Sequence, residues 1–157
     1  MSEFKGFYSL ETPDDLFQKL RHDFERIKSN PMDVYAAFDF VVSADHMVDW
    51  VYPDSCKSDK EQRANRTSLR KSEPILRVVH HLANGAKHFK AYHHKSVDGV
   101  DTRDGPFDPE FFDSSFDTGD LIVELSDDDS TALGAKTLSI LQLAEATIVY
   151  WEKKIRP

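Results

Sequence analysis

The chain has very little cysteine and no long hydrophobic stretch, and each of these absences excludes a class of protein. Its single cysteine, Cys56, cannot form a disulfide within the chain, so a reducing compartment is expected. No apolar run approaches the roughly 20 residues that a membrane-spanning helix needs. The residues after Met1 also lack the charged start and apolar core of a signal peptide. We therefore expect a soluble, cytoplasmic protein without a membrane partner.

Familiar catalytic and metal-binding motifs are also missing. The sequence contains no glycine-rich phosphate loop, no serine nucleophile elbow and no dinucleotide-binding fingerprint. Its many aspartates do not follow the spacing of a calcium-binding loop, and its histidines form no H-E-x-x-H pattern. The sequence thus leaves enzymatic activity open but favours a non-enzymatic protein, with no cofactor and no metal ion expected.

What the chain does have is charge, distributed unevenly. The net charge is −8, yet residues 57–95 contain ten Lys or Arg against three acidic residues, together with five histidines. Residues 98–129 contain twelve Asp or Glu and a single basic residue, Arg103. Segments of opposite charge attract different partners, although they do not determine the fold.

Apolar residues at helical spacing predict a mainly α fold. Helices are expected at about 12–29, 31–52, 58–70, from 72 to between 88 and 95, and 131–154. The second is apolar on most of its circumference, which predicts the central, most buried helix. Residues 96–119 are expected to form a loop that four phenylalanines (Phe107, Phe111, Phe112 and Phe116) fix to the body, followed by a strand at 121–125.

These expectations combine into a single helical domain covering residues 1–157. It would be a bundle of about four to five helices with a short β-strand or hairpin before the C-terminal helix. An acidic loop or β insertion would occupy about 96–130. A chain of this length can bury one ordinary hydrophobic core.

Two expected helices carry polar residues that are candidates for a binding site. On 31–52, Asp45, His46 and Asp49 are spaced to share a face, with Asp39 further along the same helix. They are either a carboxylate–histidine site or, as we favour, the polar stripe of a helix in contact with water.

On the fourth expected helix, His81, Asn84 and His88 follow the i, i+3, i+7 spacing and line one face. This face is a second candidate binding surface. Joined to the acidic residues of helix 31–52, His81 and His88 would instead form a metal site of the kind found in helical bundles.

The two charged blocks each allow two interpretations. Lys60, Arg63, Arg66 and Arg70 share a face that would contact RNA phosphates, or that would pack on the acidic block of the same chain, which we favour. The acidic surface, represented by Asp108, Asp113 and Asp117, would mimic phosphates and bind a nucleic-acid-handling protein, or would only solubilise the loop, which we again favour.

Parts of the chain resemble known families. Residues 37–50 (AFDFVVSADHMVDW), 82–89 (LANGAKHF) and 149–152 (VYWE) resemble a family of uncharacterised bacterial and phage-borne helical proteins. That resemblance implies a compact helical domain with a small β element and a bacterial or phage origin. It implies no particular activity.

A looser resemblance is to HEPN-type helical domains, which include metal-independent ribonucleases. The family motif places an arginine shortly before a histidine. His88 matches the histidine, which would act as the acid or base, and Asn84 matches the polar position, with Lys87 as a supporting basic residue. The arginine is missing, because Arg77 lies eleven residues before His88. Non-catalytic HEPN-like domains act as binding modules, which suits this sequence better.

The leading hypothesis is therefore a non-enzymatic binding or regulatory protein. It would use the His/Asn helix face and the acidic loop to bind a partner protein, and an exposed apolar face on the last helix would favour a homodimer. A HEPN-like ribonuclease that binds RNA and a metal-binding bundle remain as alternatives.

Overall fold

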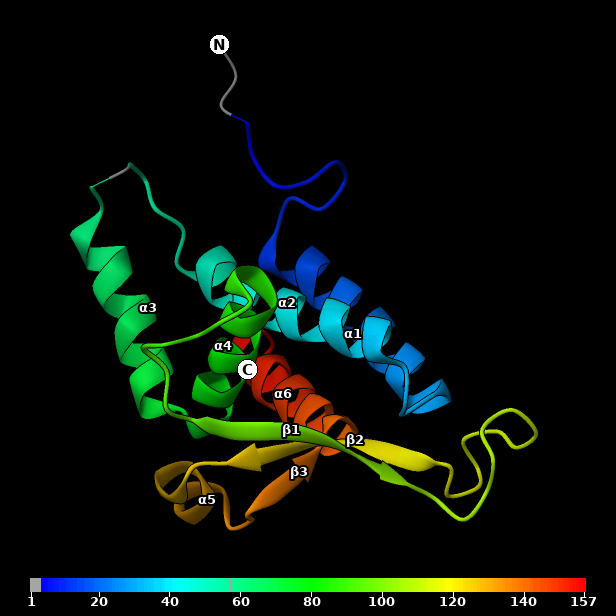
Figure 1. The fold of residues 1–157 in the computed structure, drawn as a ribbon. Coiled ribbons are helices and arrows are strands. Elements are labelled where there is room, and N and C mark those ends of the chain that lie inside the picture. Colours follow the sequence, from blue (N-terminus) through cyan, green and yellow to red (C-terminus); the bar gives the residue numbers. More distant parts are fainter. Residues whose placement is uncertain (1–3, 57) are drawn as a thin grey trace.

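The computed structural model describes residues 4–56 and 58–157, and within them the chain forms six helices and one three-stranded antiparallel sheet (Figure 1). The mainly α prediction is confirmed, but the expected number of four to five helices is too low. In chain order the elements are α1 Pro13–Ser29, α2 Val34–Val51, α3 Lys60–Ser72, α4 Pro74–His88, β1 Val97–Asp104, β2 Gly119–Leu125, α5 Asp127–Leu133, β3 Thr137–Ser139 and α6 Ile140–Ile155.

Capping side chains determine where the first helices begin. Thr12 and Asp15 form the capping box expected at the start of α1. For α2 the cap is Asp33, whose carboxylate accepts the N–H groups of Tyr35 and Ala36. Because the N-cap is Asp33, α2 begins at Val34, three residues later than predicted.

In the view of Figure 1, α1, α2, α3, α4 and α6 lie above the sheet, with α6 packed on β2 and β3, whereas α5 lies below it. Trp151 of α6, Phe17 of α1 and Phe40 of α2 are fully buried and form the centre of the core. Val123 and Leu125 of β2 are the sheet residues that pack into this core. Burial of these large side chains contributes roughly 2–3 kcal/mol each to the stability of the fold. None of the helices that the described residues form is long and apolar enough to cross a membrane.

The sheet corrects the prediction that residues 96–119 are a loop. Residues 97–104 form β1, which pairs antiparallel with β2 and places Val100 opposite Val123. An irregularity between Val97 and Gly99 interrupts the regular alternation of this strand. The sequence does not indicate this strand, because it contains few apolar residues and a glycine. Its formation depends on pairing with β2.

The last helix is also shorter than predicted. α5 ends at Gly134, whose φ of +72° is the left-handed conformation typical of a helix C-terminus. A capping box between Ser139 and Gln142 then begins α6. Residues 131–154 are therefore a short helix, a strand and a second helix, because Gly134 and Ser139 stop and restart the helical backbone.

The phenylalanines between β1 and β2 pack mainly on one another. The rings of Phe107, Phe112 and Phe116 have centroids 4.9–5.1 Å apart, and each stays more than a third exposed. Phe111 is 77% exposed. The loop extends away from the end of the sheet (Figure 1), so this small cluster stabilises the loop without entering the core.

Candidate functional site

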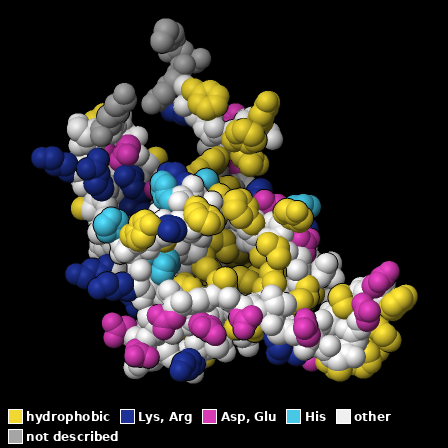
Figure 2. Space-filling model, in the orientation of Figure 1, with side chains coloured by type: hydrophobic (Ala, Val, Ile, Leu, Met, Phe, Trp, Pro, Cys, Tyr) yellow, Lys and Arg dark blue, Asp and Glu magenta, His cyan; other side chains and the backbone are white. Residues whose placement is uncertain are grey.

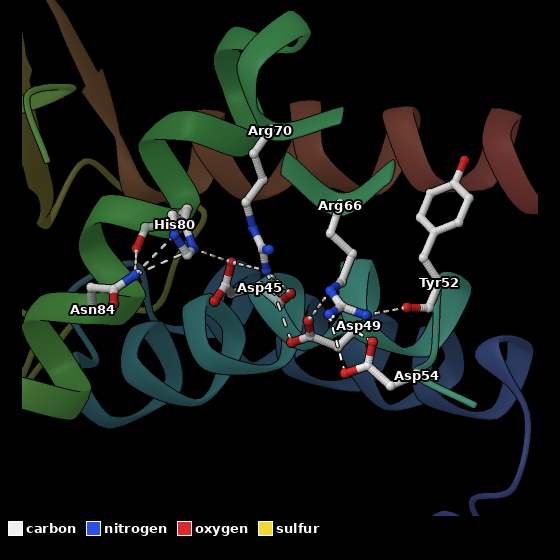
Figure 3. Close-up of polar contacts among 8 residues, drawn as sticks. All are labelled: Asp45, Asp49, Tyr52, Asp54, Arg66, Arg70, His80 and Asn84. Atoms are coloured by element: carbon white, nitrogen blue, oxygen red, sulfur yellow. Dashed lines mark hydrogen bonds and ion pairs between the residues drawn. The ribbon is translucent and has the colours of Figure 1, made fainter. Parts of the chain in front are cut away.

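A largely buried polar contact between helices far apart in sequence joins α2 to α4. Asp45 Oδ1 lies 2.8 Å from His80 Nδ1. Because an ionised carboxylate only accepts hydrogen bonds, His80 Nδ1 carries the proton and donates it. Asn84, one turn further along α4, donates to the His80 carbonyl at 2.8 Å and lies 3.3 Å from the ring nitrogen Nε2 (Figure 3).

Two arginines of α3 complete this network. Arg70 Nη2 donates to Asp45 Oδ1 at 3.1 Å and to the Asp45 carbonyl at 3.3 Å. Arg66 donates to the Tyr52 carbonyl at 2.6 Å and to Asp54 at 3.0 Å, and its Nε lies 3.4 Å from Asp49. α2, α3 and α4 are thus joined by one row of alternating charges (Figure 3).

Asp45 is the central residue of this network. Its side chain is only 14% exposed and that of Arg70 only 16%. Burial raises the pKa of Asp45, but the hydrogen bond from His80 and the charge of Arg70 more than compensate, so the pKa lies below its ordinary value. Asp45 therefore remains ionised at neutral pH and fixes the orientation of the His80 ring.

Several residues that the sequence singled out meet around one cavity of about 520 Å³ between α2 and α4. Asp45, His46 and Asp49 line it from α2, and Asn84 and Lys87 line it from α4. The polar face predicted on α2 therefore meets Asn84 and Lys87 of α4 at one site, whereas the other two residues of the face predicted on α4, His81 and His88, do not line it. Their use in binding stays a prediction.

His81 and His88 lie elsewhere. His81 Nδ1 accepts the N–H groups of Ser96 and Val97 at 3.2 and 2.9 Å, so it attaches the start of β1 to α4. Burial lowers the pKa of His81, with a smaller contribution from His80, and this keeps the accepting nitrogen unprotonated at neutral pH. His88, the proposed acid or base of the ribonuclease hypothesis, is exposed at the end of α4.

The metal hypothesis lacks a set of ligands in the part of the chain that the structure describes. No group of three or more His, Cys, Asp or Glu side chains is placed there to hold an ion. The acid–histidine contact between α2 and α4 involves His80, with an arginine on the same carboxylate. A cationic guanidinium at this position opposes binding of a metal ion.

A second concave surface adjoins the polar cavity and is mostly apolar. This apolar trough has a volume of about 470 Å³ and shares Phe38 and Ala86 with the polar cavity. It lies between α2, α4 and the helix-facing side of the sheet, and Figure 2 shows it as a hollow lined by hydrophobic side chains. Its lining includes Val34, Phe38, Val41, Leu82, Ala86, Val100, Leu121 and Ile140.

The walls of the apolar trough remain exposed to solvent. Val34 and Phe38 of α2 are 62% and 51% exposed, and Val100 of β1 is 69% exposed. Val100 lies opposite the fully buried Val123 in the sheet register, so the helices that cover β2 leave β1 uncovered. Concave surfaces lined by apolar side chains are the usual location of binding sites.

Acidic side chains border the apolar trough along the sheet (Figure 2). We use the name acidic rim for five exposed aspartates: Asp98, Asp101 and Asp104 of β1, of which Asp101 lines the trough, and Asp108 and Asp113 of the following loop, which extends beyond the end of the sheet. Hydrogen bonds from Ser115 lower the pKa of Asp113, so its charge is present at neutral pH.

Asp117, also part of the expected acidic surface, differs from its neighbours. Its carboxylate accepts Arg103 Nη2 at 2.8 Å, and this hydrogen bond lowers the pKa of Asp117. Arg103 also pairs with Asp120. The charges of these two aspartates are therefore partly neutralised, and Asp117 lies outside the acidic rim as defined here.

The sequence favoured packing of the basic face of α3 on the acidic block of residues 98–129, but two of its arginines pair elsewhere. Arg66 and Arg70 pair with carboxylates of α2 and of the segment that follows it, whereas Arg77 of α4 pairs with Asp129 of the acidic block at 2.6 Å. Ion pairs within the chain thus neutralise part of the charge of the basic block, and the carboxylates that pair with α3 come mainly from α2.

Sequence analysis missed two components of the site. His80 was outside the i, i+3, i+7 face, although its i, i+4 spacing from Asn84 was visible. The apolar trough was missed because the wide apolar surface of α2 was interpreted as burial, while Val34, Tyr35 and Phe38 in fact remain exposed. The sequence did contain a signal for the trough, because the apolar surface of α2 is wider than contact with the core requires.

Comparison of the chain with protein-family models, with curated proteins and with solved structures finds no match. The proposals below therefore rest on the geometry and charge of the described residues.

Proposed function

We propose that this chain is a non-enzymatic binding protein that accommodates a basic amphipathic helix of a partner protein in the apolar trough. The observation that supports this most directly is a concave apolar surface bordered by the acidic rim. Val34, Phe38 and Val100 expose apolar side chains on opposite walls of the trough. A helix with one apolar face and a Lys/Arg-rich face satisfies both parts of this surface.

The expected affinity follows from the exposed area. Covering the exposed part of Val34, Phe38 and Val100 contributes roughly 2 kcal/mol each, with smaller contributions from Leu82, Ala86 and Leu121, and the apolar face of the bound helix buries a comparable area. Association then costs several kcal/mol of lost translational and rotational freedom. We expect a dissociation constant in the micromolar range, as is common for regulatory contacts that must remain reversible.

Charge determines which amphipathic helix is preferred. The acidic rim carries five carboxylates without a basic side chain bound to them among the described residues. Such a border accelerates association with a basic helix and repels an acidic one. Because these carboxylates are exposed, the preference should weaken as salt is added.

The test uses two labelled model helices of equal length, one built from Leu and Lys and the other from Leu and Glu. Fluorescence anisotropy should show micromolar binding of the Leu/Lys helix, weakened by salt, and much weaker binding of the Leu/Glu helix. At 18.0 kDa the protein is also suitable for amide NMR, in which the shifted signals should cluster along α2, α4 and β1.

The decisive variant is Val100→Lys, compared with Val149→Lys. Both residues are exposed valines, and both substitutions add one positive charge, but Val149 lies on α6 outside the trough lining. Val100→Lys should weaken binding of the Leu/Lys helix by about tenfold through lost apolar contact and charge repulsion. Equal binding by the two variants would show that the helix binds elsewhere and would refute the proposal.

A further inference from the structure

A third cavity is separate from the apolar trough and shares Arg70 and His80 with the polar cavity between α2 and α4. It has a volume of about 570 Å³ and is enclosed by α3, α4, the segment before β1 and the start of α5. We call it the cationic cleft. Four Lys or Arg side chains line it (Arg70, Lys71, Arg77 and Lys95) against two aspartates, Asp128 and Asp129, which gives a net charge of +2 in a protein whose total is −8.

The two arginines of the cationic cleft are held rigidly. Arg77 donates to buried Asp129 through Nε at 2.9 Å and Nη2 at 2.6 Å, and its Nη1 donates to the Lys71 carbonyl. Arg70 is held by Asp45, while its Nε is buried and has no hydrogen-bond partner among the described residues. Both guanidinium groups are thus fixed in place before any ligand arrives.

The two lysines remain without a carboxylate. Neither Lys71 nor Lys95 forms an ion pair with another described residue. The hydroxyl-bearing residues Thr67 and Ser126 belong to the same lining, and they add hydrogen-bond donors. Two available ammonium groups, rigid guanidiniums and hydroxyls in one concave space form the donor set that phosphate oxygens require.

We propose that the cationic cleft binds the phosphate group of a nucleotide or of RNA. A phosphate presents more acceptor oxygens and more negative charge than a carboxylate, so it uses Lys71 and Lys95 together. The volume is in the range of pockets that hold ligands of nucleotide size. The imidazole rings of His80 and His94 are nearly perpendicular, with centroids 4.8 Å apart and an interplanar angle of 85°, so a base stacks on one of these rings rather than on both.

The experiment titrates the full-length protein with three probes: inorganic phosphate, adenosine monophosphate and a short oligouridylate. Binding is measured by calorimetry and by amide NMR. The test variant is the double substitution Lys71→Gln with Lys95→Gln. The matched control is Lys60→Gln with Lys153→Gln, which removes the same charge from exposed positions on α3 and α6 outside the cleft lining.

We expect saturable binding of at least one probe, with an affinity that falls by about tenfold or more in the test variant and stays within about twofold in the control. Strong binding of the mononucleotide assigns the site to a small ligand. Binding of the oligouridylate alone assigns it to RNA, and the slope of log affinity against log salt should then decrease by roughly 1.4 in the test variant. Absence of binding by all three probes, or equal affinities of test and control variants, overturns the proposal.

Discussion

The network centred on Asp45 gives the sharpest test of how the candidate site is assembled. Replacing Asp45 by alanine removes the acceptor shared by His80 and Arg70, and it leaves the Arg70 guanidinium, 16% exposed, with only the more distant carboxylate of Asp49 at 3.9 Å. Removing one partner of a largely buried pair typically costs about 3–5 kcal/mol, because the remaining charge stays desolvated. Since some solvent reaches both side chains, we expect a loss near the lower end, about 3 kcal/mol.

Asp49→Ala is the matched control for this substitution. Asp49 lies one turn further along the same helix and pairs with Arg66 at 3.4 Å and with Arg70 at 3.9 Å, but its side chain is 51% exposed. An exposed pair contributes about 0–1 kcal/mol. The comparison therefore varies burial while the residue type, the helix and one partner, Arg70, are kept constant.

Urea unfolding followed by circular dichroism gives both free energies. A loss of about 3 kcal/mol corresponds to a fall in Tm of roughly 6–12 °C for a chain of this size. Adding Arg70→Met to Asp45→Ala should recover part of the loss, because an apolar side chain replaces the unpaired charge. If Asp45→Ala and Asp49→Ala lower stability equally, burial does not determine the strength of this network and the reasoning is wrong.

Three further predictions concern other parts of the fold. Gly85→Ala should raise the free energy of unfolding by about 1 kcal/mol in urea titrations, because the glycine lies inside α4 and an added Cβ would contact nothing within 4 Å; a decrease would contradict this. His81→Ala should leave the N–H groups of Ser96 and Val97 without their acceptor and destabilise the chain by about 1–3 kcal/mol, whereas exposed His88→Ala should change stability by less than about 0.5 kcal/mol. The pKa of His81 is lower in the folded chain than in the unfolded chain, so the stability that His81 contributes is fully present above about pH 6.5 and declines as the pH falls below that value. Hydrogen exchange at the amides of residues 96 and 97 should therefore accelerate as the pH falls. An exchange rate that follows only the intrinsic pH dependence would count against this role of His81.

Local signals explain how much of the helical framework was accessible from sequence. The Thr12–Asp15 capping box and the apolar spacing after Pro13 predict α1 correctly, and Pro53, which cannot continue a helix, follows shortly after the end of α2. These features act within a few residues, so they do not depend on the rest of the fold. The mainly α class follows from them.

Elements that depend on distant partners were not accessible in the same way. β1 was interpreted as a loop because its side chains alternate poorly and its stability comes from β2, whose first residue lies fifteen positions after the end of β1. Among the described helices α2 has the largest number of buried residues, as predicted, but the exposure of Val34, Tyr35 and Phe38 depends on distant elements in the same way. Periodicity identifies an apolar surface, but only the neighbouring elements decide whether that surface is covered.

The candidate site shows the same division. The sequence by itself determined which side chains are available: carboxylates at Asp45 and Asp49 on one helix face, a polar and histidine-rich α4, a basic α3 and an acidic segment after residue 97. Only the tertiary structure decided that Asp45 meets His80 and Arg70, that His81 instead attaches β1, and that Val34, Phe38 and Val100 remain uncovered around one trough. The physical reason is that helical spacing specifies directions around one axis, whereas the pairing of charges and the exposure of apolar surface depend on how separate helices and strands pack against one another.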